Sequence, residues 1–262
     1  MPDSSEPELT IAFAYFDQPN MLRKQVEVFS GYSAELLARI KLIIVDDCSH
    51  KHAANKACKS FPVSTDIFQI IDNIPWNQMG ARNLAMKHSL GWTLLIDPDH
   101  TVPEALSKHL LDKVIPTANR NKYYLVPRAY ARKREVMKVA PNLYMIHHEA
   151  YWKGGGMDEG FRGHKGWSDI TFRIAMEGVG VKRATLDDAP KLIAWSWKDW
   201  KENEPPLISD AAVTSLNRDL KQNNARRIRI FASAKQKSGW WSIYVKSLKP
   251  IQFKWKKVYS NV

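Results

Sequence analysis

Two carboxylates stand directly after an apolar run near the middle of the chain, and their spacing suits a charged ligand. The run 94–96 (LLI) ends in Asp97-Pro98-Asp99-His100. Carboxylates two residues apart can hold a hard divalent cation such as Mg²⁺ or Mn²⁺, which in turn neutralises a diphosphate. The alternative is a polar turn after a buried strand, because Asp is a common turn former.

A second acidic pair, Asp46-Asp47, ends the apolar run 41–46 (KLIIVD). A carboxylate there could accept hydrogen bonds from a nucleobase or a ribose hydroxyl, and the alternative is again a capped turn. Arg82 lies at the start of a predicted helix, 78–90, where a guanidinium suits a diphosphate or a base. A single Arg on a helix is more often solvated, so this residue adds weight only together with the acidic pairs.

A glycine-rich stretch in the second half leads into another predicted helix, 168–177. Its sequence is GGGMDEGF over 154–161 and GWSD over 166–169. Glycines at this density suit a mobile loop or a close approach of the backbone to a ligand. A helix cap would explain Ser168 or Asp169, but it leaves the glycines unexplained.

The elements that must position these residues alternate between strands and helices. Short apolar runs of strand type occur at 9–15, 41–46, 66–71, 93–96, 123–127 and 143–147, and helical patterns begin at 20, 78, 168 and 210. Continuous apolar strands with intervening helices predict an α/β fold with a mostly parallel sheet covered on both faces. In such sheets ligands bind beyond the carboxyl ends of the strands, which is where the acidic pairs fall.

The net charge of +12 over 262 residues is concentrated at the end of the chain. Residues 218–262 contain twelve Lys or Arg residues and one acid. We therefore expect a basic C-terminal appendage that suits an anionic partner. No nucleic-acid-binding motif is present, so a nucleic acid is not an expected partner. Two cysteines, no apolar run of about 18 residues and a polar start predict a cytoplasmic protein.

Taken in order, the segments IIVDDCS, GARNLAM, LLIDPDH and GGMDEGF…GWSDITFR resemble the family 2 inverting glycosyltransferases of the GT-A fold. The resemblance runs from about residue 9 to residue 178. It implies a GT-A domain over 1–205, with a nucleotide-binding half at about 9–100 and an acceptor half at 101–205. Residues 206–262 would then form a helical, basic and aromatic extension.

The resemblance also implies roles for single residues in sugar transfer from a nucleotide-sugar, with UDP favoured, to a hydroxyl of a glycan, a lipid-linked molecule or another acceptor. Asp169 would be the general base, because an attacking hydroxyl must lose its proton. The nucleotide site would contain Asp46 or Asp47, Arg82, Asp97 and, as a wall of the pocket, Asp17. The metal, Mn²⁺ or Mg²⁺, would be held by Asp99, Asp97 and His100. Asp158, Glu159 and Trp167 would line the acceptor side.

Two departures from the family pattern matter. The family usually has Glu-Asp where this chain has Ser168-Asp169, and many relatives supply a later His to the metal, whereas this chain has none after His164. His100 or His164 could replace it, although a single His is more often hydrogen-bonded than ligating. These losses leave open a catalytically silent GT-A-like module that binds a glycan or a nucleotide.

The segment 226–262 mixes cations with seven aromatic residues. Such a mixture suits peripheral attachment to an anionic membrane. The alternative is that the aromatic side chains pack onto the main domain while the charges face water. The sequence slightly favours the second possibility, because seven aromatic side chains can build a small core layer.

Overall fold

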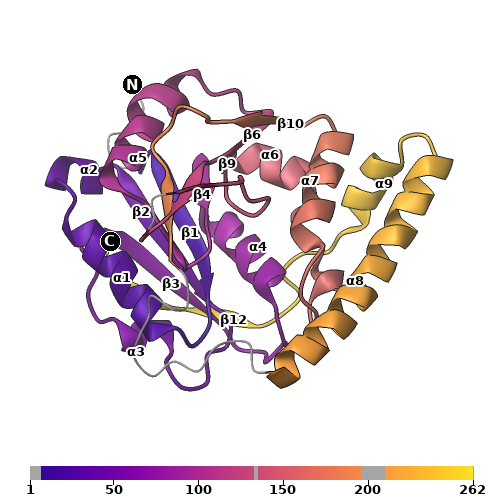
Figure 1. The fold of residues 1–262 in the computed structure, drawn as a ribbon, viewed down its shortest axis with the longest axis horizontal. Coiled ribbons are helices and arrows are strands. Elements are labelled where there is room, and N and C mark those ends of the chain that lie inside the picture. The colour runs from indigo at the N-terminus through magenta and orange to yellow at the C-terminus, as the bar shows by residue number, and fades with distance from the viewer. Residues whose placement is uncertain (1–6, 133–134, 196–209, 262) are drawn as a thin grey trace.

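The computed structural model describes residues 7–132, 135–195 and 210–261 (Figure 1). The strands used below are β1 (Leu9–Tyr15), β2 (Ile40–Asp46), β3 (Ser64–Ile70), β4 (Trp92–Leu95), β5 (His100–Thr101), β6 (Lys122–Leu125), β7 (Arg128–Tyr130), β8 (Val136–Met137), β9 (Tyr144–His147), β10 (Lys182–Thr185), β11 (Leu192–Ala194) and β12 (Trp255–Ser260). The helices are α1 (Pro19–Ser30), α2 (Ala34–Ala38), α3 (Ala54–Ala57), α4 (Gln78–His88), α5 (Glu104–His109), α6 (His148–Lys153), α7 (Ser168–Gly178), α8 (Asp210–Gln236) and α9 (Trp240–Ser247).

Within these residues the strands form two sheets. The main sheet has the order β10-β6-β9-β4-β1-β2-β3-β12, and a smaller one has the order β5-β11-β7-β8. The centre of the main sheet, from β4 through β1 and β2 to β3, is parallel. The predicted α/β architecture is confirmed, and each strand predicted in the first half lies within one or two residues of its observed bounds.

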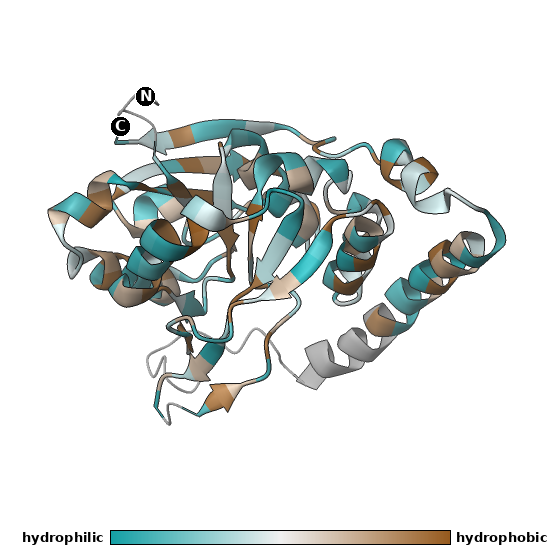
Figure 2. Ribbon diagram, turned by 90° about the horizontal axis from the view of Figure 1, so that it is seen from above, coloured by the Kyte–Doolittle hydropathy of each residue, from teal (hydrophilic) through white to brown (hydrophobic). Residues whose placement is uncertain are grey.

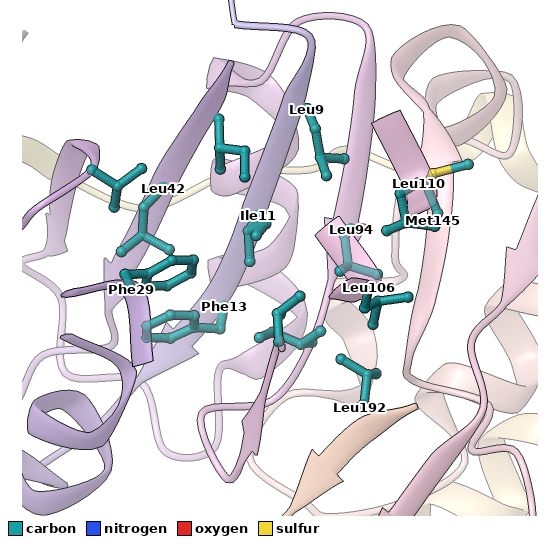
Figure 3. Packing of buried hydrophobic residues seen from close by; sticks show 14 of the residues in the cluster. Leu9, Ile11, Phe13, Phe29, Leu42, Leu94, Leu106, Leu110, Met145 and Leu192 are labelled. Carbon is teal, nitrogen blue, oxygen red and sulfur yellow. The ribbon is translucent and has the colours of Figure 1, made fainter. Parts of the chain in front are cut away.

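Helices cover both faces of the main sheet, with α1, α2 and α5 on one side and α4, α6 and α7 on the other (Figure 1). The side chains of β1 alternate between the two cores, because successive residues of a strand point to opposite faces. Ile11 and Phe13 pack with Phe29 of α1 (Figure 3), while Ala12 packs on the face that carries α4. A fully buried side chain of this kind contributes about 1.5 to 3 kcal/mol to folding.

The C-terminal part of the chain is built into this domain, so the predicted appendage is not confirmed. After α8 and α9 the chain runs back along the sheet to β12 (Figure 2), which pairs antiparallel with β3. Aromatic residues of this part pack against the two cores, as the second of the two possibilities predicted: Phe231, Trp240, Trp241, Tyr244, Phe253, Trp255 and Tyr259. The observation that suggested membrane contact is thereby explained by packing.

Two further sequence predictions concern the region before α8. The predicted domain boundary at 205 lies outside the described residues. The helix predicted to begin at 210 is α8, and it extends to Gln236. None of the helices in the described part of the chain combines the length and the apolar composition needed to cross a bilayer.

Candidate active site

The acidic residues predicted from the sequence meet at one edge of the main sheet. Asp46 is the last residue of β2, Asp17 follows β1, and Asp97 follows β4. The backbone N–H of Asp47 donates to the carbonyl of Tyr15 at 2.8 Å, which ties the ends of β1 and β2 together. Because these strands are parallel, their carboxyl ends share one edge, and a ligand there can contact all three.

Arg82 lies at the centre of this edge and joins two of the predicted functional acids. Its guanidinium donates to Asp97 at 2.6 Å and to Asp169 at 3.2 Å, and its side chain is fully buried. The Asp97 and Asp169 side chains are 21% and 23% exposed. The structure therefore brings the start of α7 against the end of β4 through one buried cation.

The charges of this trio depend on one another. Burial alone would lower the pKa of Arg82, but Asp97 and Asp169 outweigh it and raise that pKa, so the guanidinium stays protonated. Burial raises the pKa of Asp169, and the Arg82 charge offsets part of that rise. Asp169 also lies in the first turn of α7, where the helix dipole favours a carboxylate.

Close packing at the start of α4 fixes the position of Arg82. A Cβ atom at Gly80 would lie 2.4 Å from Asn77 Oδ1 and 2.6 Å from the Phe253 ring, so only glycine fits there. Most of α4 is buried, and Met79, Ala81 and Leu84 belong to the core beneath it. The helix can thus direct a charged side chain along the sheet edge without exposing it.

Asp97 accepts hydrogen bonds on both of its oxygens. Besides Arg82, Gln78 Nε2 donates to Oδ1 at 2.9 Å and Asn142 Nδ2 donates to Oδ2. The sequence reasoning missed both amides. Gln78 could have been found, since it lies one helical turn before Arg82 and on the same face of α4, whereas nothing in the sequence pairs Asn142 with β4.

Asp99 differs from Asp97 because its side chain is 41% exposed. Its Oδ1 lies 2.6 Å from Nδ1 of His100. The His100 ring is buried, and its Nε2 lies 3.3 Å from the Arg128 guanidinium. Since a guanidinium can only donate, Nε2 accepts and the proton of a neutral ring is on Nδ1, facing Asp99. Both ring nitrogens therefore have partners, and His100 orients Asp99 and is not placed as a metal ligand.

Among the residues that the structure describes, no group of three or more His, Cys, Asp or Glu side chains is arranged to hold a metal ion. A different arrangement fits these side chains. Mg²⁺ is usually held by one or two carboxylates together with substrate phosphates and water. Asp99 fits such a role because its carboxylate is partly exposed, while both oxygens of Asp97 already accept hydrogen bonds.

The structure separates the roles of the neighbouring acids Asp46 and Asp47, which the sequence left open. Asp46 accepts from the backbone N–H groups of Ser49 and Ala54, both at 2.8 Å, and so closes the turn after β2. Asp47 Oδ2 accepts from the backbone N–H of Asn77 at 3.0 Å, and its Oδ1 is buried without a hydrogen-bond partner in the structure. Asp47 thus keeps one oxygen without a partner, whereas both oxygens of Asp46 already accept hydrogen bonds.

Asp17 shapes the wall of the same region through the backbone. Its carboxylate accepts from the N–H groups of His50, Lys51 and His52 at 2.7 to 3.0 Å. Burial would raise the pKa of Asp17, but these donors outweigh it and lower that pKa. Asp17 therefore holds the 48–52 loop as an anion.

Burial raises the pKa of Asp47 to about 7, which predicts a pH-dependent stability. Between the pKa of about 3.9 in the unfolded chain and that value, the folded state keeps a proton that the unfolded state has lost. Folded stability should therefore fall as the pH rises from about 4 to about 7. Asp47→Asn removes this loss, so its advantage in free energy of unfolding should grow by roughly 1 to 4 kcal/mol over that range.

Urea unfolding at pH 4.5, 6 and 7.5 measures this difference. Asp188→Asn, at an exposed position after β10, is the matched control and should follow the wild type at every pH. If the free energies of unfolding of Asp47→Asn and the wild type change with pH in parallel, burial does not hold a proton on Asp47.

The three residues predicted on the acceptor side have different environments. Asp158 accepts from Arg226 at 2.6 Å and from the Tyr244 hydroxyl at 2.8 Å. Glu159 accepts from Asn83 and from the backbone N–H of residue 251, at 2.9 and 2.6 Å. Both carboxylates are buried and hold parts of the chain together. Trp167 is half-buried and directly precedes the first turn of α7, and its acceptor role, like that of the two acids, stays a prediction.

No protein-family model and no curated protein matches this sequence. Solved structures do resemble it. The mannosyltransferase PcManGT of Pyrobaculum calidifontis, solved with GDP-Man and Mn²⁺, aligns over 87% of this chain with a TM-score of 0.56 and 13% identity. TarS of S. aureus (residues 1–349), solved with UDP-GlcNAc, aligns over 75% with a TM-score of 0.61 and 13% identity. GalNAc-T7, solved with UDP, GalNAc and Mn²⁺, aligns over 76% with a TM-score of 0.55 and 13% identity.

These neighbours are GT-A glycosyltransferases, and the chain has the GT-A fold, as the sequence motifs predicted. The chain spans 66% of the PcManGT chain, 60% of the TarS chain and 45% of the GalNAc-T7 chain. At 13% identity the likeness establishes the fold. The roles of individual residues rest on the geometry described above.

Proposed function

We propose that this protein is a glycosyltransferase that moves a sugar from a nucleoside-diphosphate sugar to an acceptor hydroxyl with inversion at the anomeric carbon. The observation that carries the proposal is the buried Arg82 that joins Asp97, after β4, to Asp169, at the start of α7. In this arrangement Asp169, whose pKa is raised by burial, lies beside the sheet edge at which we propose that the nucleotide binds. The same fold in proteins solved with GDP-Man, UDP-GlcNAc or UDP supports this reading.

The donor would lie across the ends of β1, β2 and β4. Asp47, with its unpartnered Oδ1, would accept a hydrogen bond from the base. We favour UDP, as the family resemblance implied; the imide N–H of uracil can donate to a carboxylate, as can the N1–H of guanine, so the titration below compares the two nucleotides. Asp99 would hold Mn²⁺ or Mg²⁺, and that metal would neutralise the departing diphosphate. His100, with its Nδ1 proton directed at Asp99, would keep the carboxylate in place.

Asp169 would take the proton of the acceptor hydroxyl. As that proton moves to the carboxylate, the hydroxyl oxygen forms a bond to the anomeric carbon and the bond from that carbon to the diphosphate oxygen breaks. Attack on the face opposite the leaving group inverts the configuration. A raised pKa suits this role, because a base works best when its pKa lies near the working pH. Arg82, 3.2 Å from Asp169, would fix the orientation of the carboxylate.

Calorimetric titration of UDP and of GDP, each with Mn²⁺ or with EDTA, tests the donor site. We expect one nucleotide to bind in the presence of Mn²⁺. Asp99→Ala should weaken that binding by about tenfold or more, which corresponds to about 1.4 kcal/mol. Asp188→Ala changes an exposed acid that is not among the proposed nucleotide or metal contacts; it is the control and should bind like the wild type.

Donor turnover, measured beside the titration, decides between the proposal and a silent binding module. Binding of one nucleotide together with release of that nucleotide from its sugar donor supports a transferase. Binding without any turnover of the donor would favour the module. If neither nucleotide binds, with or without metal, the donor site assigned to this edge is wrong.

A further inference from the structure

The loop that precedes Asp169, the proposed general base, has little regular structure of its own. Residues 158–167 connect the core to α7 and contain one 3-10 turn, η3 (Glu159–Phe161). Gly163 and Gly166 have φ of 85° and 93°, which only glycine adopts readily. Trp167 has φ 67° and directly precedes Ser168-Asp169. Something outside the loop must therefore fix the start of α7.

Asn223 of α8 meets this loop with a single buried amide. Its residue is 2% exposed, and Nδ2 donates to the carbonyls of His164 at 2.8 Å and Gly166 at 2.9 Å. A longer contact of 3.4 Å reaches the carbonyl of Phe161. One side chain thus satisfies carbonyls from both ends of the loop. The Leu220 side chain, one helical turn earlier, lies where a Cβ on Gly166 would be, at 2.5 Å.

Two arginines of the same helix extend this contact in both directions. Arg226 forms a bidentate ion pair with Asp158: Nε donates to Oδ2 at 3.0 Å and Nη2 donates to Oδ1 at 2.9 Å. Its guanidinium lies so close to Gly160 that a Cβ there would be 2.2 Å away. Arg227 stacks on the Trp167 ring, 4.0 Å from its centroid. The helix therefore holds the loop at its first residue, in its middle and at its last residue.

We propose that Asn223 is a positioning residue that holds the start of α7, and with it the Asp169 carboxylate, in the orientation needed for catalysis. The inference rests on the proposed function, since it assigns Asn223 a part in the work of that base. Asp169 contacts the rest of the site through Arg82 at 3.2 Å, so its placement depends on how the loop enters the helix. Misplacing a catalytic group by about 1 Å can reduce the rate about 100-fold.

Asn223→Asp tests the contact with almost no change in size. The carboxylate cannot donate to the loop carbonyls and places a charge against them. Gln222→Glu is the matched control, since it makes the same amide-to-acid change at the neighbouring, exposed position of α8. Asn223→Ala serves as the second variant should Asn223→Asp fail to fold, because it removes the donor without adding a charge.

Hydrogen–deuterium exchange of the full-length variants is the first readout, and it does not require activity. Peptides covering 158–171 should exchange about tenfold faster in Asn223→Asp, in line with the loss of about 1.4 kcal/mol of local protection. Gln222→Glu should match the wild type. Unchanged exchange in both Asn223 variants would show that Asn223 does not hold the loop 158–167, whatever the effect on activity.

Turnover and nucleotide affinity form the second readout. Asn223→Asp should lower kcat by about 10- to 100-fold while the calorimetric affinity for the nucleotide that binds the wild type stays within about twofold. A parallel loss of affinity and turnover, or an unchanged kcat with faster exchange, would overturn the positioning role. A wild-type protein without transfer activity would overturn the proposed function instead. The exchange result would then still decide whether Asn223 holds the loop 158–167.

Discussion

Asp169→Asn is expected to reduce sugar transfer by about 100- to 10,000-fold, the usual contribution of a positioned general base. The amide is nearly the same size as the carboxylate but cannot take the proton of the acceptor hydroxyl. Nucleotide binding should persist, because Asp169 lies on α7, whereas the proposed contacts to the nucleobase and to the metal come from residues at the ends of β2 and β4. Steady-state release of nucleotide, measured beside calorimetric binding, separates the two effects.

The pH dependence of the wild type gives an independent check on the same residue. Burial raises the pKa of Asp169 above its ordinary value, and the base acts only when deprotonated. Transfer should therefore rise with pH through that raised pKa and then level off. In Asp169→Asn the residual transfer rate should no longer rise with pH in this range, while Asp188→Asn should show the same rise as the wild type. Full activity of Asp169→Asn would move the base role to another residue.

Arg82→Met is expected to lower the free energy of unfolding by about 3 to 5 kcal/mol, the cost of removing one partner from a buried ion pair. The guanidinium is fully buried between Asp97 and Asp169. Methionine fills much of its volume but leaves the two acids facing each other. Because one of them must then take up a proton, the loss should be greatest at high pH and smaller near pH 4.

Urea unfolding of Arg82→Met at pH 5 and pH 8 measures this loss. Lys87→Met, on the exposed side of the same helix, is the control and should cost little. Adding Asp97→Asn to Arg82→Met should recover part of the stability, because it removes one of the two unpaired charges. A loss below about 1 kcal/mol for Arg82→Met would mean that the trio contributes little to the fold.

The sequence predicted the parts of the site that follow from local pattern. Apolar runs marked β1, β2 and β4, and the acids that follow them had to meet because parallel strands share a carboxyl edge. The order of four motifs also predicted the GT-A fold. Those motifs named both Arg82 and Asp169, although the ion pair between them appears only in three dimensions.

The residues that were missed act through contacts between distant segments. Asn142 reaches Asp97 from 45 residues away, and Asn223 reaches Gly166 from 57 residues away. An Asn in a coil or on a polar helix has many ordinary uses, so its type and neighbours do not indicate a distant partner. The basic C-terminal composition was likewise read as an appendage, since β12 lacks the continuous apolar character of a central strand and joins the sheet at its edge.

The pairing of β12 with β3 has a consequence for how the chain matures. Residues 64–70 are synthesised nearly two hundred residues before their antiparallel partner, as the 194-residue separation of the Asp66–Ser260 hydrogen bond indicates. At ordinary rates of translation that interval lasts about 10 to 40 s. Throughout it β3 has one row of unpaired backbone groups, an edge that other nascent chains can join. β12 can pair with β3 only after residues 255–260 have been synthesised, so it is the last strand to join the main sheet.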